Sequence, residues 1–176
     1  VVNELVLWIN DAQREIALLK PDASAKNTTI TLTTGTKQEI PSDGNRLLRA
    51  VRNMSAASGG VGKRSVRLVQ REVLDAQTPD WHDPTVTGDA AHTSIVKHYV
   101  YDEQNPRNFY VYPGIAGDAY LEIIYSANPS TVAQGDNLVI PDIYANAVMN
   151  YVLYMAYMKD ADYAGNNQRA ASHFQI

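Results

Sequence analysis

Residues 98–112 read HYVYDEQNPRNFYVY and carry the clearest structural signal in the chain. Residues 93–101 and 109–112 are rich in aromatic and β-branched side chains, which favour strands. The polar residues between them include Asn105 and Pro106, which are typical of a turn. Two such runs around a short polar turn predict an antiparallel hairpin.

Further strands are predicted on both sides of this hairpin. Residues 28–33 alternate, and residues 37–40 are expected to return as their partner strand across a turn at Thr34 and Gly35. Residues 119–127 form the last predicted strand. Its apolar face consists of Leu121, Ile123 and Tyr125.

Two segments between these strands are less regular. In residues 47–54 the apolar positions fit a helix better than a strand, so helix is the first expectation and strand the alternative. Residues 65–74 predict a strand that runs into a short helix.

Both ends of the chain predict helices. Residues 4–20 repeat apolar side chains at three- and four-residue steps, and Pro21 ends the helix. The apolar face holds Leu5, Trp8, Ile9, Ala12, Ile16 and Leu19, and the polar side holds Asn10, Asp11, Gln13, Arg14 and Lys20. Pro141 and Asp142 mark the start of a second helix, and residues 160–175 predict a further one.

These elements predict an α+β fold class and a single domain over residues 1–176. Residues 1–20 and 141–176 are expected to form a helical bundle, and residues 21–140 an inserted antiparallel β-rich subdomain.

Composition excludes several classes of protein. The 176 residues contain no cysteine, which excludes disulfides, Cys-based zinc sites and thiol nucleophiles. The net charge of −4 argues against a protein that coats nucleic acid, and no segment has the ~20 apolar residues of a membrane span. The 11 tyrosines suit half-buried surfaces and interfaces. The chain begins at Val1 without an initiator Met, so we expect further residues upstream.

No motif predicts catalysis, a cofactor or a metal. Residues 59–63, GGVGK, resemble part of a phosphate-binding loop, but Ala57 and Arg64 break the pattern and a flexible loop is predicted. Residues 80–83, DWHD, predict a solvated turn anchored by Trp81 in preference to a metal site. The sequence also contains no nucleophile elbow and no pair of acids placed for catalysis, so we expect that the protein is not an enzyme.

Seven of the 15 basic residues fall between positions 46 and 71. If this region pairs as strands, several point to one face that could meet phosphates or an acidic protein partner. The alternative is a polar face with salt bridges to Glu72 and Asp75. The seven are Arg46, Arg49, Arg52, Lys63, Arg64, Arg67 and Arg71.

A series of short motifs along the chain resembles one phage protein family. The motifs are LWINDAQREI (7–16), KPDA (20–23), LTTGTKQ (32–38), VRNM (51–54), LDAQTPDWH (74–82), HYVYDE (98–103), FYVYP (109–113) and YMKDADY (157–163). In this order they are similar to the head-to-tail adaptor (connector) proteins of short-tailed tailed bacteriophages. The resemblance spans nearly the whole chain, and its motifs are structural.

The resemblance implies a virion structural protein at the head–tail junction, assembled in the host cytoplasm, with no membrane contact. Relatives form a homo-oligomeric ring, commonly a dodecamer, between the portal protein and the tail nozzle or tube protein. The ring surrounds the DNA exit channel, and a mildly acidic chain fits a channel through which DNA passes without specific binding.

Tyrosines and arginines are the candidate interface residues. They are Tyr99, Tyr101, Tyr110 and Tyr112 in the hairpin, Tyr144, Tyr151, Tyr154 and Tyr157 in the late helix, and Arg49, Arg52, Arg64 and Arg67. The alternative hypothesis is a carbohydrate- or surface-binding tail module, in which an exposed Trp81 and tyrosines form a stacking surface. The terminal helices speak against it, because such modules are usually all-β.

Overall fold

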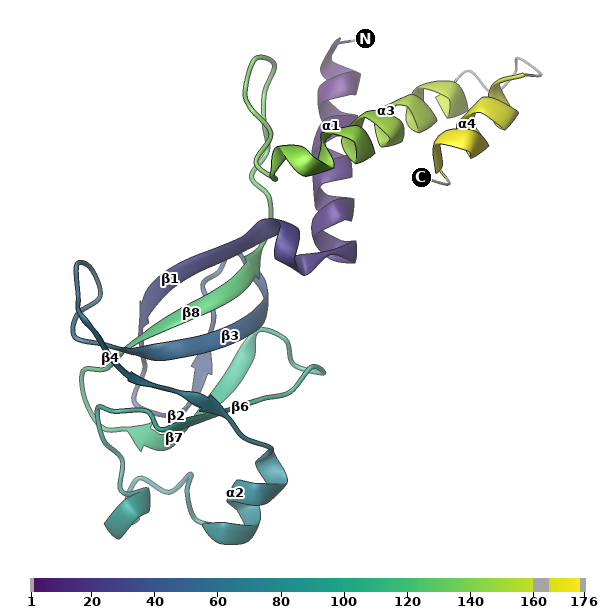
Figure 1. The fold of residues 1–176 in the computed structure, drawn as a ribbon. Helices are drawn as coiled ribbons and strands as arrows, with labels where there is room; N and C mark the ends of the chain where they lie inside the picture. Colours follow the sequence, from purple (N-terminus) through teal and green to yellow (C-terminus); the bar gives the residue numbers. More distant parts are fainter. Residues whose placement is uncertain (1, 160–164, 175–176) are drawn as a thin grey trace. The chain divides into compact units, whose positions relative to one another are not determined.

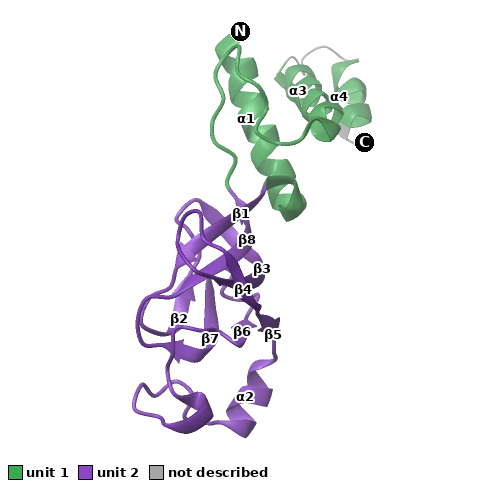
Figure 2. Ribbon diagram, turned by 60° about the vertical axis from the view of Figure 1, so that its left-hand side comes forward, with its two compact units in different colours: residues 1–24, 128–176 green, residues 25–127 purple. Residues whose placement is uncertain are grey.

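The computed structural model describes residues 2–159 and 165–174, and the chain divides into two compact units. The helical unit, residues 1–24 and 128–176, contains α1 (Val2–Leu19), α3 (Ala145–Lys159) and α4 (Asn166–Phe174) (Figure 1). The sheet unit, residues 25–127, contains the strands and α2 (Arg71–Gln77) (Figure 2). This mixture of helix and sheet confirms the predicted α+β class, while the helical bundle stays a prediction.

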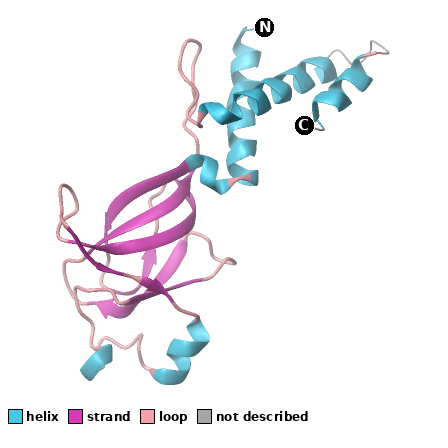
Figure 3. Cartoon of the chain, in the orientation of Figure 1, coloured by secondary structure: helices cyan, strands magenta, loops and turns pink. Residues whose placement is uncertain are grey.

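The sheet unit has two four-stranded sheets (Figure 3). The first has the order β1-β8-β3-β4 and the second β2-β7-β6-β5. The strands are β1 (Ala25–Thr31), β2 (Gly35–Glu39), β3 (Gly44–Met54), β4 (Gly62–Ser65), β5 (Arg67–Leu68), β6 (His98–Tyr101), β7 (Asn108–Ile115) and β8 (Tyr120–Ala127). Neighbours are antiparallel except β5 and β6, which are parallel.

The core of this unit comes from the alternating side chains that the sequence predicts. On β8, Leu121 and Ile123 are fully buried and Tyr125 is buried beside them, as expected. Each such side chain contributes about 1.5–3 kcal/mol by leaving water. The predicted hairpin is confirmed as β6 and β7, where Tyr101 lies opposite Phe109. Its first strand begins only at His98, and not at residue 93.

Residues 47–54 form a strand, so the expectation of a helix there is wrong. The buried residues of β3 recur at every third position, at Gly44, Leu47, Ala50 and Asn53. The pairing of β3 with β8 shifts register three times, and each shift inserts one extra residue into β3. A bulged strand therefore produces the three-residue spacing that is typical of a helix.

The predicted pairing of residues 28–33 with residues 37–40 is also wrong. β1 pairs with β8, and β2 pairs with β7, so the chain crosses from one sheet to the other before Gly35. Gly35 has a φ of 101°, which glycine adopts without strain. The side-chain amide of Gln38 stabilises this connection by donating a hydrogen bond to the Thr33 carbonyl oxygen at 2.8 Å.

In the helical unit, α1 forms where predicted, but its polar side is not all exposed. Asn10 and Gln13, predicted on that side, are buried. The Asn10 Oδ1 accepts from the Val132 N–H at 2.8 Å, and the Gln13 Oε1 accepts from the Val139 N–H at 2.8 Å. These amides satisfy the backbone of an irregular segment that lies along α1. Leu19, predicted on the apolar face, is exposed.

The C-terminal helices follow the predicted order. A 3₁₀ turn (Asp142–Tyr144) leads into α3, and α4 falls within the range predicted from 160 to 175. Residues 160–164 and 175 of that prediction lie outside the described residues.

Candidate interaction surfaces

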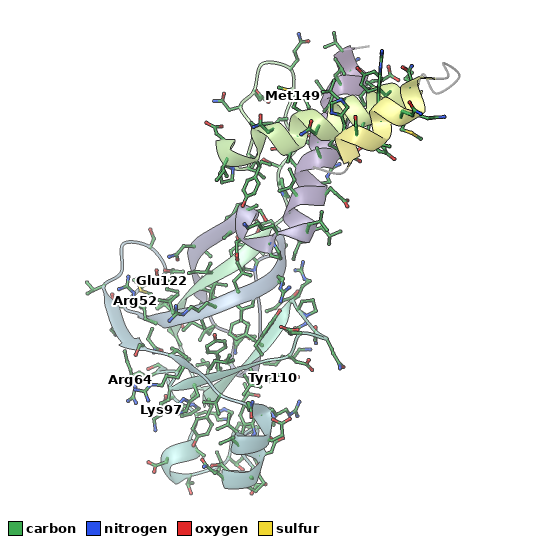
Figure 4. The ribbon with its side chains drawn as sticks, turned by 45° about the vertical axis from the view of Figure 1, so that its right-hand side comes forward. Arg52, Arg64, Lys97, Tyr110, Glu122 and Met149 are labelled. Atoms are coloured by element: carbon green, nitrogen blue, oxygen red, sulfur yellow. The ribbon has the colours of Figure 1, made fainter. Side chains whose placement is uncertain are left out.

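Helix α3 carries apolar side chains around most of its circumference, and Asn146 and Asn150 form a short polar strip near its start. Its sequence, ANAVMNYVLYMAYMK, has one charged residue, Lys159, at the very end. A helix with apolar side chains on all sides is normally buried. In α3 only Val148 is buried, and Met149 is 60% exposed (Figure 4). The helix therefore presents apolar surface that the helical unit does not cover.

Two helices cover part of α3. On the α1 side, Val148 packs in a cluster with Ala12. On the α4 side, the Asn150 Oδ1 lies 3.1 Å from the His173 Nδ1, and the Tyr157 and His173 rings stack with centroids 5.7 Å apart. The uncovered apolar side chains on or beside α3 are Ile143, Met149 and Met158.

A groove of about 310 Å³ lies between α1, α3 and α4. Its lining is mostly apolar, with Tyr151 and Tyr154 as its largest side chains. The lining residues are Ala12, Glu15, Ile16, Leu19, Ala147, Asn150, Tyr151, Tyr154 and His173. Such a lining suits the insertion of apolar side chains from a partner protein.

The four candidate tyrosines of the late helix region are all half-buried: Tyr144, Tyr151, Tyr154 and Tyr157. The Lys20 ammonium lies 5.8 Å from the centre of the Tyr144 ring. Burial raises the pKa of Tyr151, and the charge of Asp11 adds to this rise. Each tyrosine keeps some surface to offer, and its place at an interface stays a prediction.

The four hairpin tyrosines differ from one another. Tyr99 and Tyr112 are buried inside the sheet unit, whereas Tyr101 and Tyr110 are half-buried. The Tyr101 hydroxyl donates to a backbone carbonyl at 3.3 Å, and burial raises its pKa. The Arg71 guanidinium lies 5.6 Å from the centre of the Tyr110 ring. Tyr101 and Tyr110 are thus the two that retain surface for a partner.

Trp81 is fully buried, which agrees with its predicted role as the anchor of a turn, and the exposed Trp81 of the alternative hypothesis is wrong. Its indole N–H donates to the Asp75 Oδ1 at 2.9 Å and is the main cause of the lowered pKa of Asp75. Its ring stacks on His82, whose Nδ1 lies 2.7 Å from the Thr36 hydroxyl, and burial lowers the pKa of His82. A buried indole offers no face to a sugar ring, so the carbohydrate-binding hypothesis loses Trp81 from the stacking surface that it proposed for Trp81 and tyrosines.

The seven basic residues between positions 46 and 71 fall into two sets. Three are paired with acids: Arg46 with Glu103 at 3.8 Å, Arg52 with Glu122 at 2.5 Å and Arg71 with Asp75 at 3.3 Å. Arg49, Lys63, Arg64 and Arg67 form no ion pair within the described residues. Salt bridges therefore account for the first set. Of the two predicted partners, Asp75 forms one, whereas Glu72 forms none within the described residues. The second set is left available for a partner.

Met149 and Lys97 are two further candidate residues that were not predicted from the sequence. Met149 lies off the apolar stripe that the helical spacing indicates, although the small number of polar residues in α3 could have indicated it. Lys97 comes close to Arg64 and Arg67 only through the pairing of β5 with β6, for which the sequence holds no local signal.

Residues 2–159 and 165–174 contain no group of three or more His, Asp or Glu placed to hold a metal ion. In the same part of the chain no helix combines the length and the apolar character needed to cross a membrane. The GGVGK segment lies in the connection of β3 to β4 and in the start of β4, and Gly59 there has a φ of 64°.

An apolar helix left partly uncovered, half-buried tyrosines and unpaired surface cations describe a protein with surfaces for other proteins. The family model for the SU10 adaptor protein matches residues 1–176, and the chain belongs to this family of phage head-to-tail adaptors. It is thus a structural component of a phage virion that associates with other virion proteins. A search of curated proteins found no match.

Proposed function

We propose that the chain is one subunit of a homo-oligomeric ring, a dodecamer, between the portal protein and the tail nozzle or tube protein. The observation that carries the proposal is α3, which is apolar around most of its circumference but has one buried residue, Val148. Membership of an adaptor family supports the setting. The two units act as one adaptor subunit, and the ring surrounds the DNA exit channel.

The geometry of a ring explains why α3 remains partly uncovered in one chain. A closed ring uses head-to-tail contacts, in which one face of a subunit meets a different face of the next. In the helical unit, Met149 and Ile143 (60% and 82% exposed) offer one apolar face, and the groove beside Tyr151 offers another. The half-buried helical tyrosines then complete the contact between copies. The net charge of −4 lets DNA pass without adhering.

Native mass spectrometry and negative-stain imaging of the protein with its portal test this proposal. We expect closed rings of the full chain on the portal. The variant Met149→Asp should lose the ring and keep its monomer fold, because a charge on the apolar face opposes burial between copies. The matched control Val73→Asp changes a 41% exposed apolar residue on α2 and should assemble normally.

Portal is included because an adaptor can stay monomeric until a portal templates the ring. A monomer in isolation is therefore compatible with the proposal. Failure of the unmodified chain to form rings or bind the portal would refute it, and equal assembly of both variants would remove α3 from the interface.

A further inference from the structure

Four unpaired cations gather at one edge of the sheet unit. Most basic residues of residues 25–127 outside this edge have an acid within ion-pair distance, such as Lys26 with Asp43 at 2.7 Å. No such partner among the described residues serves the four at the edge. These four are Lys63, Arg64, Arg67 and Lys97.

Strand pairing brings three of these charges around one point. The Arg67 N–H donates to the Lys97 carbonyl oxygen at 3.3 Å, and Arg67 lies opposite His98 in the register of β5 and β6. After burial, the charges of Arg67, Arg64 and Lys97 are the next causes of the lowered pKa of His98. Figure 4 shows Arg64 and Lys97 at the same edge. A cluster of like charges is costly unless an anion neutralises it.

The same edge has free strand surface. β4 and β5 end the two strand orders, and Val66 joins them into one continuous strand. The Val66 N–H donates to the Val51 carbonyl oxygen of β3, and the next N–H, that of Arg67, donates to the Lys97 carbonyl oxygen, so this strand pairs on one side along β4 and on the opposite side along β5. All residues of β4 and β5 are exposed. Val61 at one end and Leu68 at the other are 73% and 62% exposed. Within the described residues β4 has no strand paired on its side away from β3, and an extended peptide can add there as a further strand.

We propose that residues 61–68, together with Lys97, bind an extended acidic segment of another virion protein. The segment would carry two or three Asp or Glu side chains for the cations, with an apolar residue at each end for Val61 and Leu68. Nucleic acid fits less well, because a phosphate backbone has no use for the exposed Val61 and Leu68. This inference goes beyond the ring, since it concerns the sheet unit and not the helices.

Fluorescence anisotropy on the full-length chain tests the proposal. The probes are labelled peptides of about ten residues that alternate Glu with Val or Thr, a Lys-for-Glu version of each, and a duplex oligonucleotide. The variant Arg64→Gln/Arg67→Gln removes two edge charges. The control Lys37→Gln/Arg49→Gln removes two exposed, unpaired charges that lie on β2 and β3, so both variants have the same net charge.

We expect an acidic peptide to bind, the edge variant to weaken it about tenfold and the control variant to change it less than about twofold. The Lys-for-Glu peptides should not bind. Three outcomes overturn the proposal: no acidic peptide of the panel binds, both variants weaken binding equally, or the duplex binds more tightly than every peptide. In the first case the cations serve only to protect the strand edge from unwanted pairing. The assay needs no ring, so its result is separate from the portal test.

Discussion

Asn53 is a buried side-chain amide that ties three segments of the sheet unit together. Its Nδ2 donates to the carbonyl oxygens of Arg64 and Val96 at 2.9 and 2.8 Å, and its Oδ1 accepts from the Val96 N–H at 2.8 Å. We expect Asn53→Ala to lower the free energy of unfolding by about 3 kcal/mol, because it strands buried backbone groups. Urea denaturation measures this loss.

The control for this experiment is Asn27→Ala, which removes an exposed hydrogen bond of 2.8 Å to Glu122. We expect a loss of less than about 1 kcal/mol there, since water replaces the lost partner. Equal losses in the two variants would contradict the role given to Asn53.

Tyr125 gives the sheet unit a dependence on alkaline pH. Its hydroxyl donates to the Asp43 Oδ1 at 3.0 Å, and burial together with this bond raises its pKa to about 12. The unfolded chain loses this proton near pH 10 and the folded chain keeps it, so stability is full below about pH 10 and falls as pH rises towards 12. We expect the stability difference between the native chain and Tyr125→Phe to shrink by ~1.4 kcal/mol per pH unit in this range. A difference that stays constant with pH would contradict the assignment.

At this scale the sequence indicated exposure poorly. Asn10 was expected to be exposed on the polar side of a helix, and Trp81 was expected to be exposed in the alternative hypothesis, although the predicted turn needed it as an anchor. Each is buried because another group satisfies its polar atoms. The Asp75 carboxylate accepts from the Trp81 indole N–H, and the Val132 N–H donates to the Asn10 side chain. Burial of a polar side chain depends on such partners, and periodicity alone does not reveal them.

Among the elements, α1 holds the segment that returns from the sheet unit through two side chains, Asn10 and Gln13. We expect Asn10→Ala to speed hydrogen exchange at the Val132 amide by about tenfold or more, because that N–H loses its acceptor. The neighbouring change Asp11→Ala removes only an exposed ion pair with Arg14 and should leave Val132 unchanged. Protection of Val132 that survives Asn10→Ala would show that another group holds this segment.

Regular elements were predictable and irregular ones were not. Buried and half-buried side chains alternate over the first residues of β8 and of the hairpin strand β7, and α1 shows a helical repeat of apolar residues. The sequences of these elements therefore predict their structure. β3 misled because its bulges change the spacing of buried residues, and register shifts depend on the partner strand β8. The pairing predicted across Gly35 was wrong for a similar reason, because a turn motif does not indicate which sheet the next strand joins.

For the whole molecule, the order of motifs along the chain was enough to place it in its family, and the family model confirms this across residues 1–176. The candidate interfaces could be predicted only in part. The tyrosines follow from composition, but the edge formed by Arg64, Arg67 and Lys97 exists only once β5 has paired with β6. A surface formed by segments that are distant in the sequence can be predicted only when the strand pairing is known.

The topology also predicts that the sheet unit folds by itself. Its first and last strands are neighbours, with Ala25 opposite Ser126, so residues 25–127 begin and end side by side and enclose their own core. A fragment of residues 25–127 should therefore unfold cooperatively and show the fluorescence of a buried Trp81. Because this fragment lacks α3, it should stay monomeric with portal present, whereas the full chain assembles. Sedimentation velocity and urea unfolding followed by tryptophan emission check both points. A fragment that is unfolded would contradict the independence of the sheet unit, and a fragment that forms rings would move the contact between copies from α3 to the sheets.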